Sequence, residues 1–157
     1  MTEGALYDFT DIRKADRSES WKMTWPVNQG MECRFWGVGT GEEEFFLANG
    51  WGQRDWKNSD VGAVLPYVVR RCRGRGVKTF ISVIEGSAKA DSFVESVQVI
   101  DPQGTIAVTT RDGIDYISSS PEDGKNILTF SRGGEEVKGR FIVLSMQEDR
   151  LKWKFEV

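Results

Sequence analysis

The stretch "LKWKFEV", Leu151 to Val157, alternates apolar and charged side chains with a period of two. Successive side chains of a β-strand point to opposite faces, so the four apolar residues share one face and the three charged residues share the other. This pattern predicts a strand with one buried face and one face in water.

Similar patterns recur along the rest of the chain, as in "WKMTW" at 21–25, "EEFFLANG" at 43–50, "KTFISVIE" at 78–85, "FVESVQVI" at 93–100 and "RFIVLSM" at 140–146. Turn residues such as Asp112-Gly113, Gly133-Gly134 and Gln147-Glu-Asp149 separate these runs. No long segment shows the apolar stripe of an amphipathic helix. The sequence therefore predicts an all-β fold, an antiparallel β-sandwich of roughly 11–12 short strands.

The composition fits a chain that folds around a substantial core. Of its 157 residues 39% are hydrophobic, including six Trp and nine Phe, so we expect a single domain over 1–157. The alternation predicts which side chains are largely buried: Trp21, Trp25, Phe80, Val83, Phe141, Trp153 and Phe155.

The net charge of the chain and the residue types and motifs that it lacks argue against several classes of function. A net charge of −3 argues against nucleic-acid binding by the whole molecule. The chain has no histidine, which removes the commonest general base and a versatile metal ligand. No calcium loop, nucleophile motif or phosphate loop is complete. We therefore expect no metal site and no cofactor. An acid and base formed by two carboxylates stays open, since the fold could bring together two of Glu42 to Glu44, Asp55, Asp60, Glu85 and Asp115.

Two cysteines, Cys33 and Cys72, are too few for a structural zinc site. They can form a disulfide only if their strands are neighbours, and the prediction is two buried free thiols. The N-terminal residues lack the apolar core of a signal peptide, and no stretch has the length of a membrane span, so we expect no membrane partner. The sequence leaves the compartment of the protein open.

The stretch "LPYVVRRCRGRGVKTFISVIEG", Leu65 to Gly86, holds five cationic residues between two apolar runs. We expect Arg71, Arg73 and Arg75 to be exposed, while Val69 packs inward. Alternation places Arg70 on the opposite side, at the edge or held by a carboxylate such as Glu85.

Aromatic and basic residues gather near the long polar loop at 49–63. Flat aromatic rings stack on sugars, and guanidinium groups bind carboxylate or sulfate with two hydrogen bonds. This combination suits an acidic polysaccharide, and the candidate glycan-binding residues are Trp51, Arg54, Trp56, Tyr67, Arg70 and Arg71. The alternative is that the tryptophans cap the sandwich and the arginines pair with nearby acids.

Several segments also carry a resemblance to a known family: "LYDFTDIRKAD" at 6–16, "NGWGQRD" at 49–55, the basic stretch, "ESVQVI" at 95–100 and "GTIAVTTRDGIDYISSS" at 104–120. In this order they resemble the C-terminal β-rich portion of the heparinase II/III-like family of polysaccharide lyases and their uncharacterised relatives. The resemblance covers most of the chain and is strongest at "LPYVVRR" and "TFISVIE".

The resemblance implies a parent protein in which a helical toroid precedes a large β-sandwich and uronate polysaccharides are cleaved by β-elimination. It also implies that the basic stretch is a hairpin of the sandwich, with strands at 64–73 and 77–86, a turn at Gly74–Gly76 and arginines clustered at its tip. In the family the main catalytic side chains come from the toroid and the earlier part of the sandwich, so none is carried over to this chain. We therefore expect a non-catalytic C-terminal part of a larger multidomain lyase. Its partners would be the N-terminal helical toroid and an acidic polysaccharide, with a periplasmic or secreted location.

Three other interpretations stay open at this point. The chain is an independent carbohydrate-binding module for acidic glycans, an intact small enzyme, or a pure assembly domain that dimerises through an open sheet edge. Binding of an acidic glycan would favour the binding module, and turnover by the isolated chain would favour the enzyme. Dimerisation without sugar binding would favour the assembly domain.

Overall fold

The computed structural model describes residues 9–15, 20–28, 30–38, 43–52, 57, 62–75, 79–101, 104–120 and 127–157. Over these residues the chain forms strands and turns and no helix. The thirteen strands, all paired antiparallel, are β1 (Thr10–Ala15), β2 (Ser20–Asn28), β3 (Met31–Val38), β4 (Glu43–Trp51), β5 (Val64–Cys72), β6 (Ile81–Ala88), β7 (Val94–Val99), β8 (Ile106–Thr110), β9 (Gly113–Ser119), β10 (Leu128–Arg132), β11 (Glu135–Gly139), β12 (Phe141–Gln147) and β13 (Arg150–Glu156). The all-β antiparallel prediction is confirmed, with slightly more strands than expected.

The chain divides into two compact units, which we describe separately. Unit 1 comprises Met1–Ser18 and Thr40–Arg75, and unit 2 comprises Glu19–Gly39 and Gly76–Val157. The single domain expected over 1–157 stays a prediction.

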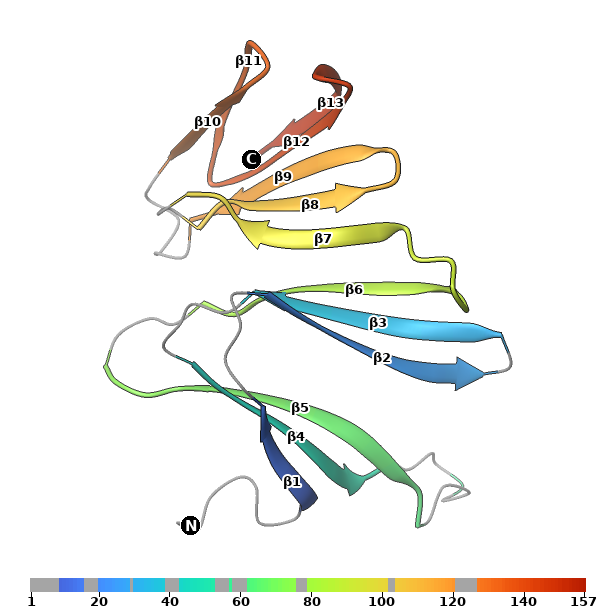
Figure 1. Ribbon diagram of the computed structural model, residues 1–157. Coiled ribbons are helices and arrows are strands. Elements are labelled where there is room, and N and C mark those ends of the chain that lie inside the picture. Colours follow the sequence, from blue (N-terminus) through green and yellow to red (C-terminus); the bar gives the residue numbers. More distant parts are fainter. Residues whose placement is uncertain are drawn as a thin grey trace. The chain divides into compact units, whose positions relative to one another are not determined.

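Unit 1 holds one three-stranded sheet in the order β1-β4-β5 (Figure 1). Strands β4 and β5 are paired from Glu43 opposite Cys72 to the other end of both strands. Just beyond that end, Gly52 N–H donates to the Ala63 carbonyl at 2.9 Å. The loop predicted at 49–63 therefore connects two paired strands, and most of its middle lies outside the described residues.

The hairpin predicted from the basic stretch is wrong. Strand β5 pairs with β4, whereas β6 pairs with β3 in unit 2, so 64–73 and 77–86 are not partners. The turn signal at Gly74 to Gly76 is local and cannot choose a partner strand. On β4 the carboxylates of Glu43 and Glu44 face the arginines of β5, and this charge match favours the observed pairing.

Unit 2 contains a five-stranded sheet in the order β13-β12-β9-β8-β7 and a three-stranded sheet in the order β2-β3-β6 (Figure 1). Between these two sheets, β3 and β7 contact each other without forming a ladder. Aliphatic side chains and one tryptophan from β3, β7 and β8 form the first core cluster: Trp36, Val38, Val94, Val97, Ile106 and Val108.

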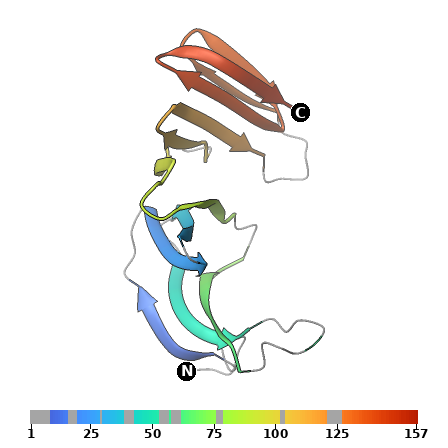
Figure 2. The ribbon, with the colours of Figure 1, turned by 90° about the vertical axis from the view of Figure 1, so that its right-hand side faces the viewer.

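A hairpin of β10 and β11 covers the other face of the five-stranded sheet and lies next to β12 and β13 (Figures 1 and 2). Its two-residue turn, Gly133-Gly134, has φ of 60° and 82°, the left-handed conformation that such tight hairpins need. Together these strands enclose the second core cluster: Tyr116, Val137, Ile142, Leu144 and Met146.

The predicted burial is wrong at the end of the five-stranded sheet. The apolar residues of β13 do alternate with the charged ones, but the charged face is the one beside the hairpin: Lys154 lies 4.0 Å from Glu135, and Glu156 accepts a hydrogen bond from Lys138 N–H at 3.1 Å. The apolar face is open. A period of two identifies two faces but not which one receives the next layer.

This open face carries three aromatic rings. Phe141, Trp153 and Phe155 are 40%, 46% and 48% exposed, and the rings of Phe141 and Phe155 meet edge to face at 6.1 Å. Phe80, also predicted to be buried, is exposed. The other three residues predicted to be buried are only half-buried: Trp21, Trp25 and Val83.

Candidate functional site

The structure describes four of the six predicted glycan-binding residues. Arg54 and Trp56 lie outside the described residues. Trp51 is the last residue of β4, and Tyr67, Arg70 and Arg71 belong to β5.

The four described residues do not share one face of the sheet. Residues opposite each other in an antiparallel pair point to the same side, and neighbours along a strand point to opposite sides. Tyr67 and Arg71 therefore lie on one face, and Arg70 lies on the other together with Trp51.

Arg70 is held inside unit 1 by Glu43. Its Nε and Nη2 each donate to a different carboxylate oxygen at 2.8 Å, and the two side chains are only 7% and 6% exposed. The carboxylate expected for Arg70 was one such as Glu85, but Arg70 is instead diagonal to Glu43, which lies opposite Cys72 on the same face of the paired strands. This bidentate pair occupies the guanidinium, so its contribution is to the fold of unit 1.

Tyr67 is also engaged. Its hydroxyl donates to the Trp51 carbonyl at 2.8 Å, and its ring meets Phe9 edge to face at 4.7 Å. The Trp51 side chain is 69% exposed. Tyr67 thus fixes the end of the β4–β5 pair, while the indole of Trp51 is largely in solvent.

A cluster of cations lies on the Arg71 face of the sheet. Lys14 Nζ lies 3.0 Å from Glu44 Oε1, Arg71 Nη2 lies 2.7 Å from Glu44 Oε2, and Arg73 Nε lies 3.2 Å from the same oxygen. The residues come from β1, β4, β5 and the position just after β5. We call this set, Lys14, Glu44, Arg71 and Arg73, the cation cluster.

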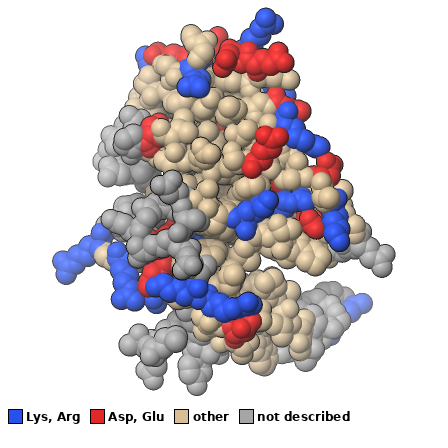
Figure 3. Space-filling model, in the orientation of Figure 1, with Lys and Arg blue, Asp and Glu red and all other residues tan. Residues whose placement is uncertain are grey.

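The carboxylate of the cluster sits beneath its cations. The Glu44 side chain is 15% exposed, and the hydrogen bond from Lys14, followed by that from Arg71, lowers its pKa from 4.5 to about 2. The Arg71 guanidinium lies 5.0 Å from the centre of the Phe46 ring, which is buried. Glu44 therefore stays ionised at any physiological pH and orders three otherwise flexible side chains. Figure 3 shows the Lys and Arg side chains that gather over this sheet around acidic ones.

Part of the cation cluster could be predicted from the sequence. Arg71, Arg73 and Arg75 were expected to be exposed, and all three are. Lys14 and Glu44 were missed, because they come from strands 30 residues apart in the chain. The run of acids at the start of β4 was the available signal, since opposite charges favour cross-strand pairing.

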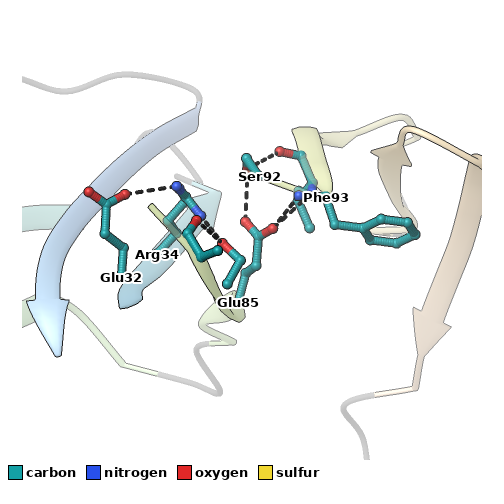
Figure 4. A network of polar contacts seen from close by, with 8 residues as sticks. Glu32, Arg34, Glu85, Ser92 and Phe93 are labelled. Atoms are coloured by element: carbon teal, nitrogen blue, oxygen red, sulfur yellow. Dashed lines mark hydrogen bonds and ion pairs between the residues drawn. The ribbon is translucent and has the colours of Figure 1, made fainter. Parts of the chain in front are cut away.

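Unit 2 contains a second polar group, in which Glu85 joins β6 to the start of β7 (Figure 4). Its carboxylate accepts hydrogen bonds from the Ser92 hydroxyl at 2.9 Å, from Phe93 N–H and from Val94 N–H at 3.3 Å. Burial alone raises the pKa of Glu85, but the hydrogen bonds, led by that from Phe93, outweigh it and hold the pKa below 4.5.

Arg34 lies beside this group and is itself buried. It donates to Glu32 at 2.8 Å and to the Ser87 hydroxyl, and its charge further favours ionised Glu85. The network is enclosed and fully paired, and it connects the three-stranded sheet to β7. We assign it to the fold of unit 2.

Other kinds of site find no support in the described residues. These contain no group of three or more His, Cys, Asp or Glu side chains that could hold a metal ion. Cys33 and Cys72 are free thiols, as predicted, but the predicted burial is wrong, because both residues are only half-buried. No helix among the described residues is long and apolar enough to cross a membrane.

Comparisons of the chain with protein-family models, with curated proteins and with solved structures found no match.

Proposed function

We propose that the chain is a non-catalytic β-sandwich domain of a heparinase II/III-like polysaccharide lyase. It supports the architecture of a larger protein that cleaves uronate-containing polysaccharide by β-elimination. The observation that supports this proposal most is the open apolar face of β12 and β13.

The open face has the properties of an interface between domains. Its three rings, Phe141, Trp153 and Phe155, expose roughly 300 Å² in total if an aromatic side chain offers about 200 Å². Apolar patches of this size on soluble proteins are often functional. The face continues into Val143 and Ser145, which are already buried on the same side of the sheet. We propose the N-terminal helical toroid of the parent protein as the body that covers it.

Two of the tyrosines that could act as the base in elimination are engaged in other contacts. The Tyr67 hydroxyl donates to a backbone carbonyl, and Tyr116 is buried in the second core cluster beneath the β10–β11 hairpin. Tyr7 lies outside the described residues. The chain has no histidine that could act as the base instead.

The test is incubation of the purified chain with heparin, heparan sulfate, alginate and hyaluronan. We expect no rise in the ultraviolet absorbance of unsaturated uronates, whereas the protein encoded by the whole reading frame should produce it. Elimination by the isolated chain that a Tyr67→Phe or Tyr116→Phe change abolishes would overturn the proposal and make that tyrosine the base.

A further inference from the structure

We propose that the cation cluster of unit 1 is a binding site for an acidic polysaccharide, with Lys14, Arg71 and Arg73 contacting its carboxylate or sulfate groups. The proposal relies on the proposed function only for the choice of a uronate glycan as ligand. The site differs from the six residues predicted from the sequence, of which it retains Arg71 alone.

The cluster has an excess of positive charge. Among the residues that the structure describes, Glu44 is the only carboxylate that these three cations contact. The four groups of the cluster together carry two net positive charges, in a chain whose net charge is −3. The three cationic side chains are 45% to 76% exposed while Glu44 is mostly covered, so an approaching anion meets the cations first.

The cations are also ordered before a ligand arrives. Arg71 donates both its Nε and its Nη2 to Glu44 and lies over the Phe46 ring. These contacts engage one edge of the guanidinium, which has five N–H donors, and leave donors for a second anion. Side chains that are already fixed lose less conformational entropy when they bind. Glu44 is thus a positioning residue of the site.

The spacing of the arginines fits a ligand with repeated charges. Arg71 lies at the end of β5 and Arg73 just after it, and their nitrogens, at 2.7 and 3.2 Å from the same Glu44 oxygen, are no more than about 6 Å apart. A polysaccharide with an anionic group on successive sugars presents charges at separations that such a pair can contact together. Tyr67 lies on the same face of β5 but four residues away, about 13 Å along the strand, so it adds no aromatic ring beside the cations.

A nucleic acid fits the site less well. Duplex DNA carries one charge per about 1.7 Å of axis, and its proteins neutralise about 6–10 phosphates. Two excess charges on an acidic chain do not offer this number of contacts. DNA therefore serves as the comparison ligand in the test.

The test compares two double variants that have the same net charge. Arg71→Gln/Arg73→Gln removes two arginines from the cluster. Arg111→Gln/Arg150→Gln removes two exposed arginines of unit 2, one of which, Arg111, is also paired with a carboxylate, Asp91, at 2.6 Å. The Kd for heparin, for desulfated heparin, for alginate and for duplex DNA is measured by titration calorimetry at low and high salt, with neutral dextran as a blank.

We expect wild type and the Arg111/Arg150 variant to bind the acidic glycans equally, more weakly at high salt. The Arg71/Arg73 variant should bind them at least about tenfold more weakly, because each arginine contributes a charged hydrogen bond. Desulfated heparin separates the two anionic groups: retained binding assigns the site to carboxylate, and lost binding assigns it to sulfate.

Three outcomes would overturn the site: no binding of any acidic glycan at low salt, equal losses in both double variants, or DNA binding as tight as glycan binding. Arg73→Gln alone, at the most exposed position, shows whether the loss follows the cation or a disturbed fold. Ultraviolet absorbance is followed in the same samples. If the absorbance rises, the chain is an enzyme and the proposed function is contradicted, but the binding site is not. If no acidic glycan binds and the absorbance does not rise, only the proposed binding site is contradicted.

Discussion

The carboxylate of Glu85 is the clearest point at which one substitution should separate two elements of unit 2. It joins β6 to the beginning of β7 through three hydrogen bonds, two of them from backbone N–H groups. Glu85→Ala removes the acceptor and leaves the N–H groups of Phe93 and Val94 without it. The Ser92 hydroxyl keeps a partner, because it also donates to the Val94 carbonyl at 2.7 Å.

The magnitude follows from these contacts. A hydrogen bond to a charged group contributes about 1.5–3 kcal/mol, and two backbone donors lose theirs. Phe93 is exposed, so water can partly replace the acceptor there, whereas Val94 is buried. We therefore expect Glu85→Ala to lower the free energy of unfolding by about 3–4 kcal/mol. Glu85→Gln keeps an acceptor oxygen and should cost about 1–2 kcal/mol, and Ser92→Ala about 1 kcal/mol.

The assay is urea denaturation followed by tryptophan fluorescence, repeated across pH. The folded pKa of Glu85 is below 4.5, so its contribution is present above about pH 4.5 and is lost as the pH falls through the lowered value. The stability difference between wild type and Glu85→Gln should therefore shrink in acid. A Glu85→Ala change of less than about 0.5 kcal/mol, or a difference that does not depend on pH, would refute this reasoning.

Two further predictions concern burial. Glu43→Gln should destabilise unit 1 by about 3 kcal/mol, because the charge of Arg70 stays buried without the carboxylate. The double variant Glu43→Leu/Arg70→Met removes both charges and should be nearly neutral. Urea denaturation of the two variants measures this difference. Leu144→Ala, at a position with 0% exposure, should cost about 3–5 kcal/mol, while Phe155→Ala on the open face should cost about 1–2 kcal/mol; equal costs in thermal denaturation would mean that the open face is part of the core.

The sequence was sufficient for the strands and several turns, because both depend on local chemistry. The alternation of β13 and the glycine pair at 133–134 specify a strand and a tight hairpin whatever the rest of the chain does. The partners of each strand depend on residues far away. Thus β5 and β6 looked like a hairpin, although Glu43 and Glu44 direct β5 to β4.

The candidate site shows the same limit. Arg71 could be chosen from its neighbours in the chain, and its exposure follows from its strand face. Nothing near it in the sequence points to Lys14, which reaches Glu44 from the other side of β4. Arg70 was chosen for the same reasons as Arg71, yet a single step along the strand turns it to the opposite face and into a buried pair.

We propose that another domain covers the aromatic face of β12 and β13. Hydroxyl-radical footprinting with mass spectrometry measures this directly at Trp153 and Phe155, in the isolated chain and in the protein encoded by the whole reading frame. We expect both side chains to be oxidised in the isolated chain and protected in the longer protein, while the exposed side chain of Trp51 is the reference in unit 1. Equal oxidation of Trp153 and Phe155 in the two proteins, or a reading frame that adds no further domain, would contradict it.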